Sequence, residues 1–362
     1  MPDNKATMTD RERVEAMLRR EKLDRVPIHL PGTGFSTVYA GGSIADAYNK
    51  PNVSLASQRK AWRDFGCVCT PLFGRPTHLA SEFGGEIKLP SSEFSQAPMV
   101  TRFPVDTVED VWNLKPPDVK TAGTVPMSVE FGQEFYKTSL REEPDNEPFI
   151  MFWAGGLFTG AANIPSLEKI CRWLIRKPEV VHRLMRLTTD YYIELAQYWK
   201  DTFGVDRALP LIGEPSTANN IISPKQFEQF VLPYTKEYCD ILLNMGYKHI
   251  FVHICGEQNL NLPYWAQIPF GDPGLISIGH EIKLETGAKY FPNDIIVGNL
   301  EPAIVQVKAP EEVYEAAGQV IREGKKISGG YIFSLGCELP PNATVENLRA
   351  LTRAVNDFGW YD

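Results

Sequence analysis

Eight short apolar runs, rich in β-branched residues, alternate with helical patterns along the chain. The runs span residues 25–30, 66–73, 148–153, 207–213, 249–255, 274–279, 294–299 and 330–336. Such nearly continuous apolar runs are typical of parallel strands that are covered on both faces. The helical patterns lie at about 56–65, 128–141, 177–203, 224–246, 258–267, 283–289, 301–323 and 343–357. Eight strands alternating with helices in 362 residues predict an α/β fold, a (β/α)8 TIM barrel.

Two additions to the barrel are expected. Residues 9–22 predict a helix ahead of the first strand, and residues 74–106, with "GEIKLP" and "MVTRFPV", predict a hairpin inserted after the second strand. Ser223 before Pro224 and Thr344 before "VENLRALTRAV" are helix-start signals. Because no internal repeat, low-complexity tract or linker is found, we expect a single domain spanning residues 1–362.

Composition and charge exclude several classes of protein. The chain is 43% hydrophobic and 23% charged, as in ordinary globular proteins, and its net charge of -8 argues against nucleic acid or an anionic membrane as a partner. No apolar run approaches the roughly 20 residues of a membrane span. The polar start of the chain predicts no signal peptide, and six scattered cysteines predict no disulfide framework. We therefore expect a cytoplasmic enzyme.

The candidate functional residues lie at the ends of the predicted strands. In (β/α)8 barrels the chemistry lies at the carboxyl ends of the strands. The residues predicted at or just after those ends are Trp153, Glu214, His253, Cys255, His280, Asn299, Glu301 and Cys337.

Three of these residues form a candidate zinc site. His253 and Cys255 are two residues apart, so they point to the same face of a strand. Cys337 follows the eighth strand, and closure of the barrel brings it to the same rim. One imidazole and two thiolates suit a catalytic zinc ion, whose fourth position would be open to Glu214 or water. The alternative is a core histidine with two buried apolar cysteines.

Glu214 and His280 are candidate catalytic residues. Glu214 is a possible zinc ligand, proton donor to a leaving oxygen, or residue that orients such a group. Its alternative role is a charge at the start of the helix that follows, stabilised by the helix dipole. His280 is positioned to donate a hydrogen bond to a substrate oxygen, although a lone histidine at the rim is weak evidence.

Four further residues are candidates for contact with substrate. Trp153 would supply an aromatic wall for a ring, and Phe35 and Tyr39 follow the first strand. For all three the alternative is plain packing. Asn299 in "GNLEP" has two possible roles, which are contact with substrate and capping of the next helix.

The motifs around the zinc set resemble a known family. "FVHICG", "IVGNLEP" and "FSLGCELPPNATVENLRAL" resemble the uroporphyrinogen decarboxylase superfamily, specifically its corrinoid-dependent methyltransferase branch. The branch signature, H-x-C followed far downstream by C, falls on His253, Cys255 and Cys337. The resemblance runs from the first strand to the last helix and is strongest from residue 214 onward. It implies a barrel, zinc held by these three residues, and methyl exchange with a corrinoid protein.

The resemblance also separates the possible reactions. The decarboxylases carry an arginine-rich loop after strand one, but "HLPGTGFSTVYAGG" contains no arginine, which disfavours a decarboxylase or a tetrapyrrole-binding barrel. The stretch "ISIGHEIKLETGAKYFPNDIIVGNLEP" resembles O-demethylase methyltransferases. We therefore expect methyl transfer from a small methoxylated substrate, an aryl methyl ether, to Co(I). Since the chain has no D-x-H-x-x-G cobalamin motif, the corrinoid is expected on a separate protein. The alternative is a methylcorrinoid:thiol methyltransferase of the coenzyme M type.

Overall fold

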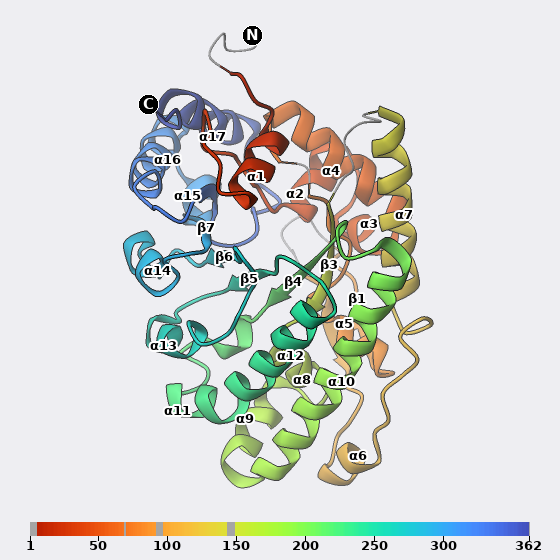
Figure 1. The fold of residues 1–362 in the computed structure, drawn as a ribbon. Coiled ribbons are helices and arrows are strands. Elements are labelled where there is room, and N and C mark those ends of the chain that lie inside the picture. The colour runs from red at the N-terminus through yellow and green to blue at the C-terminus, as the bar shows by residue number, and fades with distance from the viewer. Residues whose placement is uncertain (1–5, 69, 92–96, 143–148, 362) are drawn as a thin grey trace.

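The centre of the molecule is a parallel sheet of six strands in the order β3-β4-β5-β6-β7-β8 (Figure 1). The computed structural model describes residues 6–68, 70–91, 97–142 and 149–361. The strands are β3 (Ile150–Gly155), β4 (Ala208–Gly213), β5 (Phe251–Ile254), β6 (Leu275–Ile278), β7 (Ile295–Leu300) and β8 (Tyr331–Leu335). They correspond to the last six predicted strands, which confirms the α/β fold. Residue 148 of the predicted third strand and Cys69 of the second lie outside the described residues.

The first two predicted strands are extended segments that pair through isolated contacts instead of a continuous ladder. Ile28 forms a parallel bridge with Phe333 of β8, and the amide of Val68 donates to the carbonyl of Ile28. Pro27 and Pro71 lie within these segments and lack the N–H donors that a ladder needs. The segments nevertheless occupy the first two strand positions of the predicted (β/α)8 barrel, next to β8.

Helices cover the outside of the sheet (Figure 1). The larger ones are α4 (Pro51–Phe65), α7 (Val125–Glu142), α10 (Pro178–Phe203), α12 (Leu232–Asn244), α16 (Pro310–Gly324) and α17 (Val345–Phe358). Shorter helices α13 (Leu262–Trp265), α14 (Leu284–Tyr290) and α15 (Pro302–Val307) lie between the later strands. The predicted caps are confirmed, because the hydroxyls of Ser223 and Thr344 accept the amides of Gln226 and Asn347.

The two predicted additions are also present. Helix α1 (Asp10–Leu18) precedes the first strand segment, and β1 (Glu86–Lys88) pairs antiparallel with β2 (Met99–Arg102). Residues 92–96 of this hairpin lie outside the described residues. Several short helices were not predicted from the sequence: α2 (Thr33–Tyr39), α3 (Ile44–Asn49), α5 (His78–Glu82), α6 (Val108–Asn113), α8 (Leu157–Asn163) and α9 (Leu167–Arg176). Helices α2 and α8 begin next to glycines, which weaken a helical pattern in the sequence.

Side chains alternate between the inside of the barrel and its helix-covered outside, as the pleat of a strand requires. One apolar cluster fills the inside and includes Met151, Leu211, Phe251, Leu275 and Ile332. Two residues further along the strands, the same face carries Trp153, Gly213, His253 and Ser277. The apolar cluster therefore forms a floor beneath the polar layer at the carboxyl ends of the strands.

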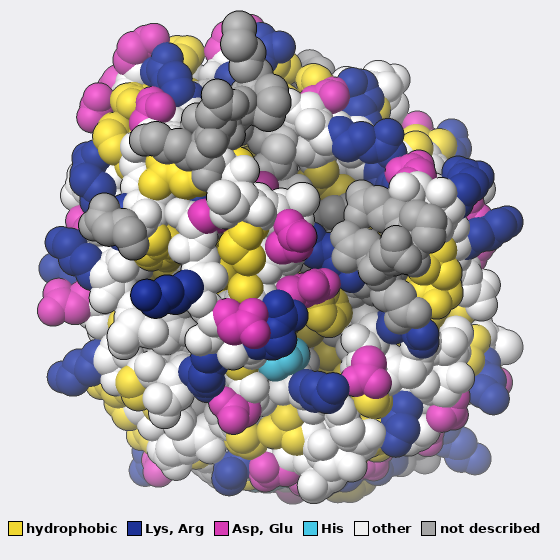
Figure 2. Space-filling view, turned by 45° about the horizontal axis from the view of Figure 1, so that its top comes forward, with side chains coloured by type: hydrophobic (Ala, Val, Ile, Leu, Met, Phe, Trp, Pro, Cys, Tyr) yellow, Lys and Arg dark blue, Asp and Glu magenta, His cyan; other side chains and the backbone are white. Residues whose placement is uncertain are grey.

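The described helices include no candidate membrane span, and the face drawn in Figure 2 carries charges of both signs. None of the helices in the described ranges combines the length and apolarity needed to cross a bilayer. On the face displayed in Figure 2, lysine and arginine side chains are interspersed with aspartate and glutamate. Mixed charge of this kind produces little net field over that face.

Glu214, directly after β4, ties two neighbouring β/α units together. Helix α8 begins at Leu157, and Gly156 before it has no side chain that could cap the helix. The carboxylate of Glu214 takes that role from the next strand, accepting the amides of Phe158 (2.9 Å) and Thr159 (3.0 Å) and the Thr159 hydroxyl (2.8 Å). The side chain is fully buried, and burial raises its pKa to about 7 although these hydrogen bonds oppose the shift. The helix dipole it meets belongs to α8, in the unit before its own strand.

We expect Glu214→Ala to destabilise the protein by about 2 kcal/mol or more. A buried donor left without an acceptor costs about 1–3 kcal/mol, which applies to the buried Phe158 amide, and the amide and hydroxyl of the partly buried Thr159 lose the same acceptor. Urea unfolding of the variant measures this. Glu130→Ala, an exposed position within α7, is the control and should stay within about 0.5 kcal/mol of wild type. A Glu214 variant as stable as the control would contradict the capping role.

Candidate metal centre

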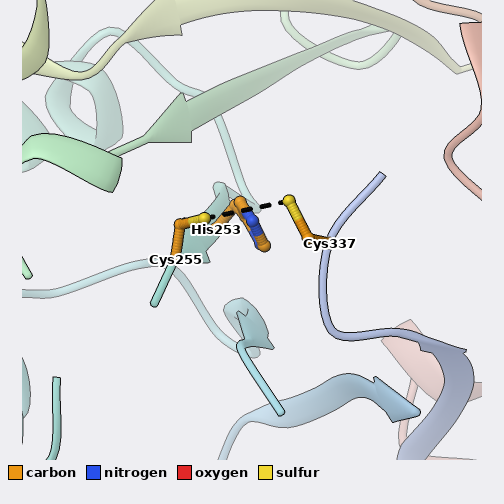
Figure 3. A group of neighbouring side chains, drawn as sticks. All are labelled: His253, Cys255 and Cys337. Carbon is orange, nitrogen blue, oxygen red and sulfur yellow. Dashed lines mark hydrogen bonds between the residues drawn. The ribbon is translucent and has the colours of Figure 1, made fainter. Parts of the chain in front are cut away.

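Three potential metal ligands meet at the carboxyl-terminal rim of the barrel. His253 lies in β5, Cys255 follows the end of that strand, and Cys337 follows β8 (Figure 3). Their ligand atoms all lie within 4.8 Å of one another, and the two sulfurs are 3.8 Å apart. The set selected from the sequence therefore comes together in space.

Three glycines allow the loops that carry these residues to pack against one another. A Cβ atom on Gly279 would lie 3.1 Å from the amide nitrogen of Gly256, and one on Gly336 would lie 2.5 Å from that of His280. Gly256 also has a φ of +77°, in the left-handed region that favours glycine. The turns after β5, β6 and β8 can approach this closely because these positions lack side chains.

A fully buried glutamine fixes the turn after Cys255. The amide nitrogen of Gln258 donates to the carbonyls of Cys255 (3.3 Å) and Glu214 (3.1 Å). Its oxygen accepts from Asn261 (2.9 Å) and from the indole of Trp265 (3.1 Å). Because both polar atoms of the buried Gln258 side chain are hydrogen-bonded, it joins the ends of β4 and β5 rigidly to helix α13.

The two thiols of the set share one hydrogen bond and therefore ionise unequally. The contact with Cys255 lowers the pKa of Cys337, and nearby His253 lowers it further. The same contact, together with burial, raises the pKa of Cys255. The metal-free centre thus favours one thiolate and one thiol. A cation that binds both sulfurs must displace the remaining proton, since the thiolate is the ligand form.

The donors and their spacing fit a zinc ion. Two thiolates on a tetrahedral zinc with Zn–S bonds of about 2.3 Å are about 3.8 Å apart. That is the separation between the sulfurs of Cys255 and Cys337. One imidazole nitrogen completes three ligands, and a catalytic zinc site keeps its fourth position for water or substrate.

Glu281 is a neighbour of the metal set that the sequence analysis missed. Its carboxylate lies over the turn after β6, where it would be 2.5 Å from a Cβ on Gly279. After the Cys337 contact and burial, the charge of Glu281 is a further cause of the raised pKa of Cys255. The sequence signal was the "GHE" at the end of β6, from which only His280 was selected.

His280 and Glu214, the two predicted catalytic residues, lie in different surroundings. His280 Nδ1 is 3.5 Å from Glu281 Oε2, and the imidazole side chain is 37% exposed. Glu214 is buried with its carboxylate directed at the start of α8, as described above. Their catalytic roles stay predictions.

Trp153 lies inside the barrel between two glycines. A Cβ on Gly74 would be 2.1 Å from the indole Cδ1, and one on Gly213 would be 2.9 Å from Cζ3. These contacts fix the plane of the indole between the second strand segment and β4. The ring is only partly buried, so the predicted aromatic wall stays a prediction.

Asn299 supports the turn after β6. Its amide nitrogen donates to the carbonyls of Gly279 (3.1 Å) and Ile282 (2.6 Å). It thereby holds the turn that carries Glu281. The side chain is 9% exposed, and its predicted contact with substrate stays a prediction.

Phe35 and Tyr39, also predicted to contact substrate, lie on helix α2 and pack against α4. Their rings stack at 5.8 Å, and both contact Phe65. The Tyr39 hydroxyl donates to Asp64 at 2.8 Å. These contacts join α2 to α4, and the predicted role in substrate binding stays a prediction.

Known proteins are similar to this chain over nearly its whole length. The methylcobamide:CoM methyltransferase MtbA of Methanosarcina mazei is 25% identical over 97% of this chain and 98% of its own. The uroporphyrinogen decarboxylase of Xylella fastidiosa is 22% identical over 96% of this chain and 98% of its own. A solved structure, a methyltransferase from Methanosarcina mazei, superposes with a TM-score of 0.78 at 20% identity, covering 97% of this chain and 99% of that one.

The structural likeness, at that identity, concerns the fold and agrees with the barrel described above. The sequence resemblance is confirmed at the level of the family. The model of the uroporphyrinogen decarboxylase (URO-D) family matches residues 9–358, nearly the entire chain. The chain therefore belongs to the uroporphyrinogen decarboxylase family.

Proposed function

We propose that this protein is a zinc-dependent methyltransferase that exchanges a methyl group with a corrinoid carried by a separate protein. The observation that carries the proposal is the arrangement of His253, Cys255 and Cys337, whose sulfur spacing matches two thiolates on one zinc ion. Full-length relatives named as methylcobamide:CoM methyltransferases support the corrinoid part of the proposal.

The direction of transfer that we propose is from the methylated corrinoid to a small thiol. The sequence favoured the opposite direction, from an aryl methyl ether to Co(I), with the thiol reaction as its alternative. The names of the relatives favour the alternative, since two are methylcobamide:CoM methyltransferases, 25% and 23% identical, and a third is a methylated-thiol--coenzyme M methyltransferase. A thiol such as coenzyme M is therefore the proposed acceptor.

A bound zinc ion would supply Lewis acidity, which lowers the pKa of a coordinated thiol and generates a nucleophile at neutral pH. His253, Cys255 and Cys337 would hold the ion, and the two thiolates would balance its charge. The thiol proton leaves to solvent. The sulfur takes the methyl group while both electrons of the carbon–cobalt bond stay on cobalt, giving Co(I).

Glu281 is the proposed acceptor of the proton from the incoming thiol. Its carboxylate lies on the turn that Gly279 packs against Gly256, and its charge contributes to the raised pKa of Cys255. The carboxylate would take the thiol proton and release it to solvent.

Purified protein should contain about one zinc ion per chain, because three donors form the site. We expect the double variant Cys255→Ala/Cys337→Ala to contain no zinc ion, as measured by elemental analysis. Cys171→Ala removes a partly buried cysteine on α9 and is the matched control, which should keep the ion. Wild type without zinc, or full occupancy in the double variant, would show that the site is wrong.

Zinc-loaded protein should demethylate methylcobalamin when coenzyme M is added, and the conversion to Co(I) can be followed by its absorbance under anaerobic conditions. Removing zinc with a chelator should abolish the reaction, and adding zinc should restore it. We expect no cobalt methylation from a panel of methoxylated aromatics. If those compounds methylate reduced corrinoid while thiols stay inert, the direction proposed here is reversed.

A further inference from the structure

We propose that Ser277 is a positioning residue for the metal centre, which fixes the ring orientation and tautomer of His253 so that Nε2 faces the metal. This inference rests on the zinc site of the proposed function. It concerns a residue that is not itself one of the three proposed ligands. Ser277 stands on β6, the strand next to the one that carries His253.

The geometry of the pair is direct. His253 and Ser277 are register partners on the parallel strands β5 and β6, so both side chains point into the barrel at the same level. Ser277 Oγ lies 2.9 Å from His253 Nδ1, within normal hydrogen-bonding distance. Ser277 is 5% exposed, so little water competes for this bond.

The contact assigns the two ring nitrogens to different partners. A neutral imidazole carries one donor and one acceptor, and the group bonded to one nitrogen determines what the other offers. In the proposed tautomer Nδ1 donates its proton to Ser277 Oγ, which leaves the lone pair of Nε2 for the metal. The imidazole also interacts with Cys337 on its other side, toward the sulfurs (Figure 3). The hydroxyl therefore presents the ligand nitrogen to the thiol pair.

Burial explains what the Ser277 hydroxyl gains from this contact. Leu275, which is two residues earlier and on the same face of β6, is buried and apolar. A hydroxyl buried beside such a residue costs free energy unless it is hydrogen-bonded. Its partner is His253, and an alanine would fill the position without that cost. What serine offers at this position and alanine does not is the hydrogen bond to the imidazole.

A hydroxyl also has a different effect from the carboxylate that often supports a metal-bound histidine. A carboxylate would add negative charge beside two thiolates that already balance a divalent ion. The neutral hydroxyl orients the ring without adding charge, so the centre with His253, Cys255 and Cys337 stays neutral. Neutrality leaves the ion more electrophilic toward a fourth ligand.

Zinc affinity, measured by competition with a chromophoric chelator, tests the inference. Partners of metal-bound histidines typically contribute about 10- to 100-fold in affinity, so Ser277→Ala should weaken zinc binding by that factor. Ser277→Thr keeps the hydroxyl and should stay within a few-fold of wild type. Ser334→Ala removes an equally buried serine on β8 and is the matched control. Thermal unfolding of each metal-free variant checks that the fold is intact.

A second readout does not depend on zinc. In protein labelled with nitrogen-15 at its six histidines, metal-free His253 should show an Nδ1 proton protected from exchange. The signal should persist in Ser277→Thr and disappear in Ser277→Ala. If wild type lacks zinc but shows this proton, the proposed function fails and the positioning role stands. If the proton is absent in wild type, or if Ser277→Ala binds zinc as tightly as wild type, the inference is overturned.

Discussion

The close approach of three backbone turns at one end of the barrel determines the geometry of the whole centre. Strands β5 and β8 are three positions apart in the sheet, which corresponds to about 14 Å along it. Cys255 and Cys337 nevertheless place their sulfurs 3.8 Å apart. Gly279 and Gly336 make this possible because a side chain on either would meet a neighbouring turn, and Gly256 supplies a φ of +77° that favours glycine. Cys255, Cys337, Glu281 and His280 are carried by these turns, and His253 lies in β5 just before the first of them.

Around this contact, buried amide and carboxylate side chains hold the loops in place. Gln258 links the turn after β5 to β4 and α13. Asn299 of β7 holds the turn after β6 by hydrogen bonds to two carbonyls of that turn. Glu214 does the same between β4 and α8. Each is fully or nearly fully buried, so its hydrogen bonds are shielded from water and strongly directional. The metal ligands can therefore keep their positions before an ion arrives.

The sequence predicted those features that follow from periodicity and strand order. Continuous apolar runs identified the parallel strands, and the two-residue spacing of His253 and Cys255 placed both at one rim. Cys337 was found because barrel closure brings the end of β8 to that rim. Features that depend on tertiary packing were not predictable. The acceptor role of Glu214 toward α8 joins two β/α units, and Glu281 reaches the site through the fold of a turn that no spacing rule describes.

Closure of the barrel depends on segments that are far apart in the sequence. The amide of Val26 donates to the carbonyl of Gly359, and Ile28 forms a bridge with Phe333, so one edge of the first strand segment finds its partners about 300 residues later. Contacts so distant in sequence form late, because the entropy of closing the loop is lost before they contribute. Cys337 belongs to this closing segment. During synthesis on the ribosome, a nascent chain would therefore expose His253 and Cys255 as an incomplete chelate, and high-affinity metal uptake would await the segment after β7.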